Sequence, residues 1–558
     1  MMLHALLLKG NFQDSVTLMV LSRDLSGLST VNRVSVMMGT PANKDVYRET
    51  GMWHDALAEA TPNDLCIVVD SDTTDPAIAE TIAGEIKTRL AELAVGKRKA
   101  GYSTARSWRR ARQLLPDANM VLISVAGQYA PALARQALED GCHAMIFSDN
   151  VPVEEERALK TLAGERGLLV MGPDCGTAII DRVPLAFANR IPAGPIAVVG
   201  ASGTGIQELT SQIAWLGGGI THALGLGGRD LSETIGGASA ATALALVAAD
   251  PRSRVVAFVS KQPAAAVKDK VMAILQGLGK PVVALFLGDR PTRRVVGNVH
   301  LARSLDEAAS IAVDLAAIDV QASQLPDVSG TAICGLYTGG TLASEASFLL
   351  GEVLDLTDQA THTEGRMFDA AGHRIIDLGD DIYTRGRPHP MIDPFARGEM
   401  IRDLAADTSI GVLLLDVVLG FGSHSDPAGE VVKAVQDLRA ARGEVAPVVV
   451  IATVTGTNED PQDRASQTAM LEAAGIEIAG SVRAAVLLAA RAVKGQTAQA
   501  AEGVTPAGLL AQAPAVINIG LTGFAQDLKA AGAKVVHLEW TPVAEGADKF
   551  RQLAASLQ

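Results

Sequence analysis

The sequence predicts an α/β protein built from several domains. At 558 residues the chain is too long for one hydrophobic core, and usual domain sizes indicate about three or four units. Its apolar share of 48% is mostly Ala, Val, Leu and Ile, with 54 glycines and only 4% aromatic residues. This composition suits helices packed closely on parallel sheets. Apolar runs of strand length also alternate with helical patterns along most of the chain.

Charge and hydropathy exclude several classes of function. The net charge of −14 disfavours binding to nucleic acid or to an anionic membrane, because both need clustered Lys and Arg. The apolar run in residues 1–10 is too short and wrongly flanked for a signal peptide, and no later run is long enough to span a membrane. We therefore expect a cytoplasmic protein whose partners are small molecules and other proteins, with neither nucleic acid nor membrane among them.

The four cysteines predict neither a metal site nor a disulfide framework. Cys66, Cys142, Cys175 and Cys334 lie far apart, without CxxC or Cys/His spacing. Cys175, in "GPDCGT", falls in a predicted turn. A small residue in a tight loop is the favoured interpretation there, and a reactive thiol is the alternative.

The amino-terminal part of the chain predicts two domains and a connector. Residues 1–95 alternate strand and helix in an order that fits a small α+β domain. Residues 96–116 are rich in Lys and Arg and weakly patterned, which predicts a basic linker. Residues 117–190 again alternate strands with helices, as in a parallel, doubly wound, Rossmann-like domain. No GxGxxG follows the first of these strands, so dinucleotide binding is not predicted.

An internal repeat organises the carboxyl-terminal half. "GPIAVVGASGTGIQELTSQIAWLGG" is echoed by "GTAICGLYTGGTLASEASFLLGE", and three further blocks match in the same order. The repeat predicts two similar flavodoxin-like domains, residues 191–320 and 330–495, packed face to face. Residues 509–558 contain a strand, a helix and a strand, too few to form a sheet alone. We expect this segment to dock on the rest of the chain or on another subunit.

The glycine turns of the two repeats predict a phosphate site. Glycines let the backbone close on a ligand, and the first amides of a helix lack intrahelical acceptors and favour an anion. One such turn is equally consistent with an ordinary capped helix, but two copies favour a shared clamp on one anion. The candidate phosphate-binding residues are Ser202, Gly203, Thr204 and Gly205 in the first copy and Gly339, Gly340, Thr341 and Leu342 in the second.

Further candidates lie where predicted strands end. The loop "IIDLGDDIYTRGRPHPMIDP" supplies Asp380, Arg387 and His389 as candidate catalytic residues. Arg387 suits a carboxylate or phosphate, and the pKa of a histidine suits proton transfer. A surface ion-pair cluster, with Asp380 as a turn or cap residue, is the alternative. The candidate substrate-binding residues are Arg229, Asp230, Cys175, Thr177, Gly422 and Ser423.

Several motifs in order resemble one enzyme superfamily. "GPDCGTAI", "VVGASGTG", "LGLGGRD", "GGTLASEA" and "LDVVLGFGSHSDPA" are similar to segments of the succinyl-CoA synthetases. Residues 117–320 resemble the α-subunit, and residues 330–495 resemble the carboxyl-terminal domain of the β-subunit. This implies a CoA-binding-like domain at 117–190, two ligase-type domains, and a phosphate held between two helix N-termini. "KGNFQDSVTLM", "VSVMMGTPANK", "SVAGQYA" and "RPHPMIDP" carry a closer resemblance to the FdrA family.

The resemblance also has departures that bear on function. The phosphohistidine segment is missing, since only residues 290–300 occupy its interval, and the CoA-binding glycine loop near the amino end and the ATP-grasp domain are absent. The FdrA resemblance implies a subunit of oxamate carbamoyltransferase, which converts oxalurate and phosphate into oxamate and carbamoyl phosphate in purine (allantoin) breakdown. That enzyme has further subunits and needs phosphate as co-substrate but no cofactor. An acyl-CoA synthetase (acid-thiol ligase) that uses CoA is the second expectation, and a non-catalytic scaffold or regulator the third.

Overall fold

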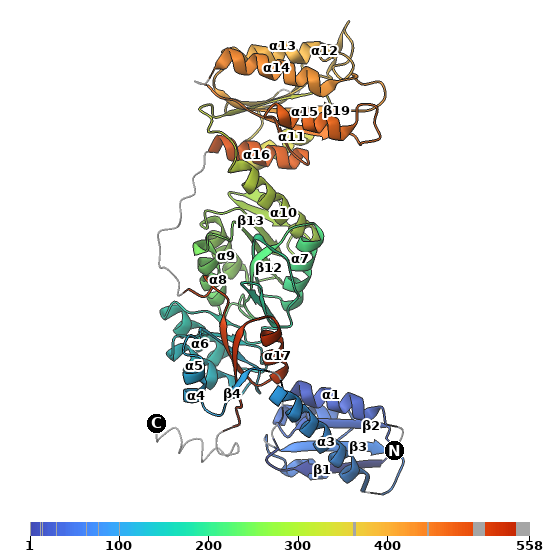
Figure 1. The fold of residues 1–558 in the computed structure, drawn as a ribbon, viewed down its shortest axis with the longest axis vertical. Coiled ribbons are helices and arrows are strands. Elements are labelled where there is room, and N and C mark those ends of the chain that lie inside the picture. Colours follow the sequence, from blue (N-terminus) through green and yellow to red (C-terminus); the bar gives the residue numbers. More distant parts are fainter. Residues whose placement is uncertain are drawn as a thin grey trace.

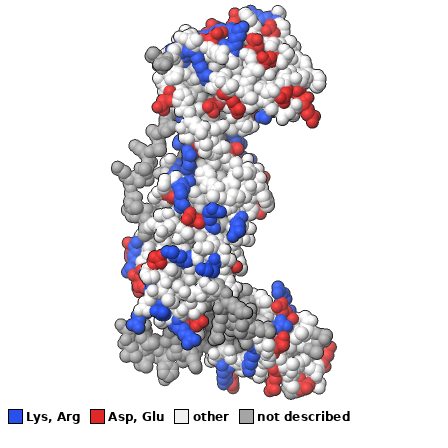
Figure 2. Space-filling model, in the orientation of Figure 1, with Lys and Arg blue, Asp and Glu red and all other residues white. Residues whose placement is uncertain are grey.

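Four α/β units follow one another along the long axis of the molecule (Figure 1). The computed structural model describes residues 2–542, apart from residues 12, 14, 29–30, 63, 76, 100, 361–363, 444–445 and 495–507. Within these residues no helix is both long and apolar enough to cross a membrane. Figure 2 shows basic and acidic side chains interspersed over one face of the molecule.

The first unit is a three-stranded antiparallel sheet with helices, in agreement with the predicted α+β fold. Its central strand is apolar and completely buried, because helices and a 3-10 turn cover its two faces. The strands lie in the order β1 (Met2–Leu8), β3 (Leu65–Ser71), β2 (Arg33–Met38). The helical elements are α1 (Ser15–Ser26), α2 (Pro41–Glu49), η1 (Asp55–Glu59) and α3 (Ala77–Lys99).

The second unit is a six-stranded parallel sheet assembled from two distant parts of the chain. Its strand order is β4 (Ser103–Ala105), β23 (Lys534–Leu538), β22 (Ala515–Ile519), β5 (Met120–Ile123), β6 (His143–Ile146), β7 (Val170–Met171). Its helices are α4 (Trp108–Leu114), α5 (Ala130–Glu139), α6 (Val153–Glu165) and α17 (Thr522–Ala530). The carboxyl-terminal segment thus supplies two inner strands of a Rossmann-like sheet, which is how it docks on the chain.

This assembly corrects the predicted linker at residues 96–116. Ser103–Ala105 is an edge strand that pairs in parallel with β23, with Thr104 opposite His537. α4 follows directly, and the Ser107 side chain caps its N-terminus. A local pattern does not reveal this strand, because its pairing partner lies more than four hundred residues later in the sequence.

The third and fourth units are the two predicted repeats. Their parallel strands have the same order, β11-β10-β12-β13-β15 and β18-β16-β19-β20-β21, which is the flavodoxin order 2-1-3-4-5 in both. The strand order therefore confirms the repeat. Antiparallel strands extend both sheets, β8 and β9 in the third unit and β17 in the fourth, and β14 pairs with β15.

The bounds of these elements follow the sequence blocks closely. The third unit comprises β8 (Thr177–Ile180), β9 (Val183–Ala186), β10 (Ala193–Gly200), α7 (Gly203–Trp215), β11 (Ile220–Gly225), α8 (Ala238–Ala249), β12 (Val255–Ser260), α9 (Ala265–Gln276), β13 (Val282–Phe286), β14 (Val295–Val296), β15 (Val299–Ala302) and α10 (Leu305–Ala322). The fourth comprises β16 (Ala332–Tyr337), α11 (Gly340–Leu354), β17 (Arg366–Ala370), β18 (His373–Asp377), α12 (Asp381–Thr384), α13 (Phe395–Asp403), η2 (Leu404–Ala406), β19 (Ile410–Val418), α14 (Pro427–Arg442), β20 (Val449–Thr455), α15 (Arg464–Ala473), β21 (Glu477–Ile478) and α16 (Val482–Lys494).

The two repeats pack through α10 of the third unit and α16 of the fourth. Apolar residues of both units form one continuous buried cluster there, including Leu315 and Leu488. Gln321 on α10 donates to the carbonyl of Ile478 at 3.1 Å, and Asp319 pairs with Arg254 and Arg491. The helix layers thus join the units, while the carboxyl edges of both sheets stay outside this contact.

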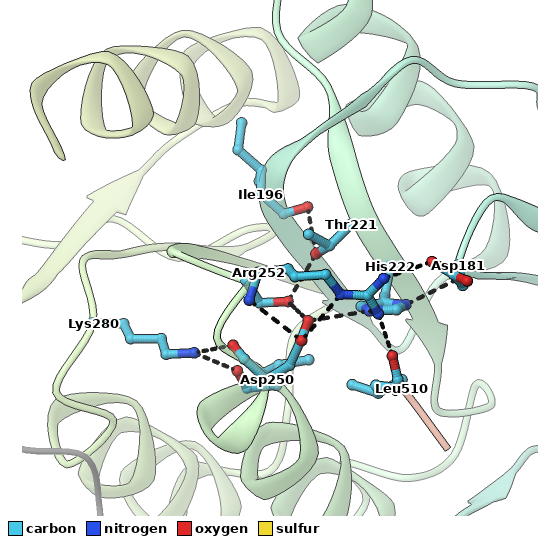
Figure 3. Close-up of polar contacts among 10 residues, drawn as sticks. Asp181, Ile196, Thr221, His222, Asp250, Arg252, Lys280 and Leu510 are labelled. Carbon is cyan, nitrogen blue, oxygen red and sulfur yellow. Dashed lines mark hydrogen bonds and ion pairs between the residues drawn. The ribbon is translucent and has the colours of Figure 1, made fainter. Parts of the chain in front are cut away.

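A polar network ties the returning carboxyl-terminal segment to the third unit (Figure 3). Arg252 donates to the carbonyl of Leu510 and pairs with Asp181 at 2.7 Å. Beside it, the buried His222 contacts Asp250 at 3.1 Å, and burial lowers the pKa of this histidine. Arg252 therefore joins three pieces of chain: the β8–β9 turn, the loop before β12, and the residues that lead into β22.

Candidate functional site

The N-terminus of α7 offers an open anion site at the carboxyl edge of β10. Ser202 caps the helix, and its hydroxyl accepts from the amide of Gly205 at 3.2 Å. Among the described residues, the amides of Gly203 and Thr204 have no acceptor. A Cβ added to Gly203 would stand 3.4 Å from the hydroxyl of Thr177, which places that predicted residue beside the turn. The geometry fits an oxyanion bound by backbone amides.

The turn before α11 differs, because it contains a carboxylate of the chain itself. Asp416, fully buried in β19, accepts from the amides of Thr338 and Gly339 at 2.7 and 2.8 Å. Its charge is balanced by the buried Arg397 at 3.2 Å. A Cβ on Gly340 would lie only 2.7 Å from the carboxylate of Asp377. The amides of Gly340 and Thr341, which correspond to those of Gly203 and Thr204, have no acceptor among the described residues. The two carboxylates beside this turn disfavour a phosphate, and the phosphate-binding role of Gly339, Gly340, Thr341 and Leu342 stays a prediction.

Asp377 belongs to the candidate loop that also contains Asp380, and the structure places it at the carboxyl edge of the sheet, beside the turn before α11. Burial raises the pKa of its carboxyl group, and the nearby charges of Asp380 and Asp416 raise it further. A hydrogen bond from the amide of Gly379 and the neighbouring His389 lower the same pKa. Asp377 is the last residue of β18, and ligands bind at strand ends in such sheets.

The three predicted catalytic residues have different surroundings. His389 is held by the amide of Met391, which donates to Nδ1 at 3.2 Å, and its Nε2 lies beside Gly379 and Asp377. Asp380 caps α12 by accepting from the amide of Ile382 at 3.0 Å, which is the alternative considered for it. Arg387 is exposed, and its side chain pairs with no residue that the structure describes. Only His389 and Asp377 are brought together.

The predicted residues of the 420–424 loop lie next to the His389 loop. The amide of His424 donates to the carbonyl of Met391 at 2.8 Å, which joins the two loops. Gly422 has a φ of 83°, and the hydroxyl of Ser423 donates to the carbonyl of Gly420 at 2.7 Å. Both residues therefore shape a turn at the carboxyl edge of β19, and their substrate-binding role stays a prediction.

The structure contradicts the substrate-binding role predicted for Asp230. Its carboxylate is completely buried and accepts from Lys160 at 2.8 Å and from the amides of Ser239 and Ala240. Arg229 pairs with the buried Glu156 on α6 at 2.9 Å. These contacts join the second unit to the third, and Asp230 lies out of reach of a ligand. The side chain of Arg229 is 42% exposed, and its substrate-binding role stays a prediction.

Burial also makes the thiol of Cys175 unreactive. The side chain is 3% exposed, and burial raises the pKa of its thiol to about 12. A thiol in this environment stays protonated and unreactive at neutral pH. The favoured interpretation of a small residue in a tight loop thus agrees with the structure, and the substrate-binding assignment does not.

Another glycine turn, in addition to those before α7 and α11, lies in the second unit, and the sequence did not reveal it as a site. β22 and β5 are neighbours in the sheet. The strand that follows β22 in the chain, β23, lies on one side of this pair, and the strand that follows β5, β6, lies on the other side. Such a reversal of strand order opens a ligand crevice at the carboxyl ends of the two strands. Gly520 has a φ of 109°, and a Cβ there would lie 2.3 Å from the carbonyl oxygen of Ser124. The Ser124 hydroxyl accepts from Leu521, and the next amides, of Thr522 and Gly523, have no acceptor among the described residues.

Comparison with known proteins identifies the superfamily. A CoA-ligase model matches residues 336–492, and a CoA binding domain model matches residues 193–288. The chain is 39% identical over 501 residues to the uncharacterized protein YahF of Escherichia coli, which covers 85% of this chain and 96% of YahF. The chain belongs to the YahF family. Its members are CoA-ligase-like proteins of the succinyl-CoA synthetase superfamily, as the sequence motifs predicted.

The chain is also similar to more distant proteins. The α-subunit of malate–CoA ligase from Methylorubrum extorquens is 24% identical over 260 residues, 42% of this chain and 85% of that subunit. An acetyl-coenzyme A synthetase from Ca. Korarchaeum cryptofilum, solved with phosphate and ADP, covers 67% of this YahF-family chain at 15% identity, with a TM-score of 0.41. The CoA binding domain model matches the third unit, whereas the prediction had placed the CoA-binding-like domain at residues 117–190.

The first unit matches a model described as the AllF heavy metal-associated domain, over residues 1–106. Its residues do not fit a heavy-metal site. Thiolates are the ligands that soft metals prefer, and Cys66, the only cysteine in this range, is completely buried in β3. No group of three or more His, Cys, Asp or Glu side chains with a geometry for a metal occurs in the described part of the chain.

Proposed function

We propose that this YahF-family chain is an enzyme subunit that transfers an acyl group through a phosphate intermediate, as an acid-thiol ligase does. The open N-terminus of α7 carries the proposal. It presents the free amides of Gly203 and Thr204 at the carboxyl edge of β10, inside the segment that matches the CoA binding domain model. Amides and the helix dipole together favour a doubly charged phosphate group over a neutral ligand.

In this proposal the substrate is an acyl phosphate. The thiolate of CoA attacks the acyl carbon, a carbon–sulfur bond forms, and the carbon–oxygen bond to phosphate breaks. The thiol proton passes to solvent or to a base, and phosphate leaves with the electron pair. The amides of Gly203 and Thr204 and the hydroxyl of Thr204 stabilise the charge that grows on the leaving phosphate oxygens.

The crevice beside Gly520 supports CoA as the acceptor. Its amides of Thr522 and Gly523 begin a helix at a strand-order reversal, which is where phosphate-bearing ligands bind in sheets of this kind. In the sequence, the missing CoA-binding glycine loop near the amino end counted against CoA as a substrate. The structure supplies a glycine turn in the same sheet from the carboxyl-terminal segment.

A second candidate is carbamoyl transfer, which one observation favours. The residues between β13 and β15 form only a short hairpin, and the histidine at its end, His300, is 8% exposed. Burial and the nearby Arg483 lower its pKa to about 4. A histidine so enclosed does not suit a phosphorylated intermediate. Carbamoyl transfer needs no phosphorylated histidine. A phosphate oxygen attacks the carbamoyl carbon of oxalurate, the bond from that carbon to the oxamate nitrogen breaks, and the nitrogen takes up a proton.

The two candidates are separated by assaying the full chain with and without the proteins encoded beside its gene. Formation of a thioester from acetyl phosphate or another acyl phosphate and CoA supports the ligase. Release of carbamoyl phosphate from oxalurate and inorganic phosphate, without CoA, supports the carbamoyltransferase. In either case Gly203→Val should remove activity, and His300→Gln should retain it. Neither product, with every neighbour present, would refute both.

A further inference from the structure

A cleft of about 580 Å³ lies between the two repeats, away from both helix N-termini. The segment from Thr292 to Val295 of the third unit forms one wall, and the outer face of α11, with β17, forms the other. A smaller cavity of about 100 Å³ reaches inward from it toward α16, and the two share Arg294, Phe348 and Glu352. Clefts of this volume at domain interfaces are typical sites for small molecules.

Most charges around the cleft are already neutralised by partners. Arg293 pairs with Asp355 across the domain boundary. Arg294 pairs with Glu307 and donates to the carbonyl of Leu301 at 2.9 Å. These two arginines therefore close the wall of the cleft and are not free for a ligand.

Two opposite charges in the inner cavity have no such partner. Glu352 on α11 and Arg483 on α16 both line it, and neither side chain makes a hydrogen bond or an ion pair with any residue that the structure describes. Asp314 and Glu307 act on Arg483 only through space. His300, the remaining titratable group of the lining, is neutral at neutral pH because burial lowers its pKa to about 4.

Apolar side chains lie between and around these two charges. Leu349 and Val353 of α11 and Leu487 of α16 line the inner cavity. Phe348 is 66% exposed and lies where the inner and outer spaces meet. The lining thus combines one unpaired anion, one unpaired cation and an apolar surface.

We propose that this interdomain cleft binds a small zwitterion of the α-amino acid type with an apolar side chain. Glu352 accepts from the ammonium group, Arg483 donates to the carboxylate, and the side chain packs on Phe348. Val295 of β14 lines both spaces, so a ligand held in this way lies between β14 of the third unit and α11 of the fourth. This binding site is separate from the proposed phosphate site.

The test is binding to the full chain, measured by calorimetry and by thermal shift, with L-leucine as the probe. Two analogues each lack one charge, 4-methylpentanoate without the ammonium group and 3-methylbutylamine without the carboxylate. L-Leucine should bind saturably, and each analogue at least tenfold more weakly. Glu352→Gln and Arg483→Gln should each weaken L-leucine at least tenfold. Glu233→Gln and Arg109→Gln, which make the same charge changes at exposed positions without partners, should leave binding unchanged.

The wild-type protein alone is enough to refute the proposal, so a variant that fails to fold does not rescue it. Absence of saturable binding of L-leucine and L-phenylalanine would overturn it. Equal binding of the singly charged analogues would overturn it too, because the cleft would then recognise only an apolar body. Both results are independent of the acyl-transfer assays, since no phosphate, CoA or oxalurate is present.

Discussion

The two repeats have the same strand order but a different charge in the turns before their first helices. In the first repeat Val259 of β12 lies opposite Gly200, the last residue of β10. The parallel register of the second repeat puts Asp416 of β19 in the corresponding place, one residue beyond the pair Leu336 and Leu415. The turn before α7 has a valine at this place and no carboxylate, whereas in the turn before α11 the aspartate accepts from the amides of Thr338 and Gly339. One strand-end residue therefore separates an uncharged turn from a turn that carries a carboxylate.

This difference shows what duplication preserves. The sheet order and the helix layers depend on apolar periodicity, which many sequences satisfy, so both copies keep them. The ligand chemistry depends on single residues at strand ends, where exchange of one side chain changes the charge of the site. Variants at matched positions of the two repeats test this account directly.

The largest effect is expected from Asp416→Val, which places the valine of the first repeat into the second. Arg397 would remain buried and unpaired, and the amides of Thr338 and Gly339 would lose their acceptor. Breaking a buried ion pair in this way costs about 3–5 kcal/mol. Urea unfolding of the variant should show that loss. The double variant Asp416→Val/Arg397→Leu should recover part of it, and a loss below about 1 kcal/mol would contradict the assigned pairing.

The next effect is on phosphate binding and concerns the two glycines at the first helical positions. Gly203→Val fills the space beside Thr177 in front of the open amides, so we expect phosphate affinity to fall at least hundredfold, or about 2.7 kcal/mol. Gly340→Val meets the carboxylate of Asp377, where no phosphate is expected, and should leave phosphate affinity unchanged. Calorimetric titration with inorganic phosphate measures both. Equal losses of phosphate affinity in the two variants would instead support one anion bound between both helix N-termini.

A smaller difference is expected at the threonines that follow. Thr204→Ala should weaken phosphate binding by about 1–2 kcal/mol, because a hydroxyl donor to a charged acceptor is lost. Thr341→Ala should have no effect, and the double variant should be additive. Non-additive losses in the double-mutant cycle would show that both helix ends contact one anion.

The sequence predicted the repeats well because their signals are local. The block that contains Ser202 and Gly203 predicts a strand, a glycine turn and a helix within about a dozen residues, and its second copy repeats that order. The carboxylate in the second turn was not visible, since Asp416 lies 77 residues beyond Gly339 and looks like one more residue of an apolar strand. The same limit hid the partnership of Ser103–Ala105 with β23, and the burial of Asp230 against Lys160.

The smallest predicted effect is the pH dependence of the second repeat through Asp377. Burial and its acidic neighbours raise the pKa of this carboxyl group in the folded state. The folded protein therefore holds the proton more tightly than the unfolded chain, and stability falls as pH rises through the interval between the two pKa values.

Asp377→Asn removes the ionisation but keeps an acceptor for the amide of Gly379. The variant should melt at a higher temperature than the wild type near neutral pH, and this gain should shrink to nothing as the pH falls below the ordinary range of an aspartate. A gain that stays constant over the same pH series would show that Asp377 acts through packing and not through its charge. The first repeat provides the control, because Thr177→Val beside the open α7 turn introduces no titrating group and should shift the melting temperature equally at every pH.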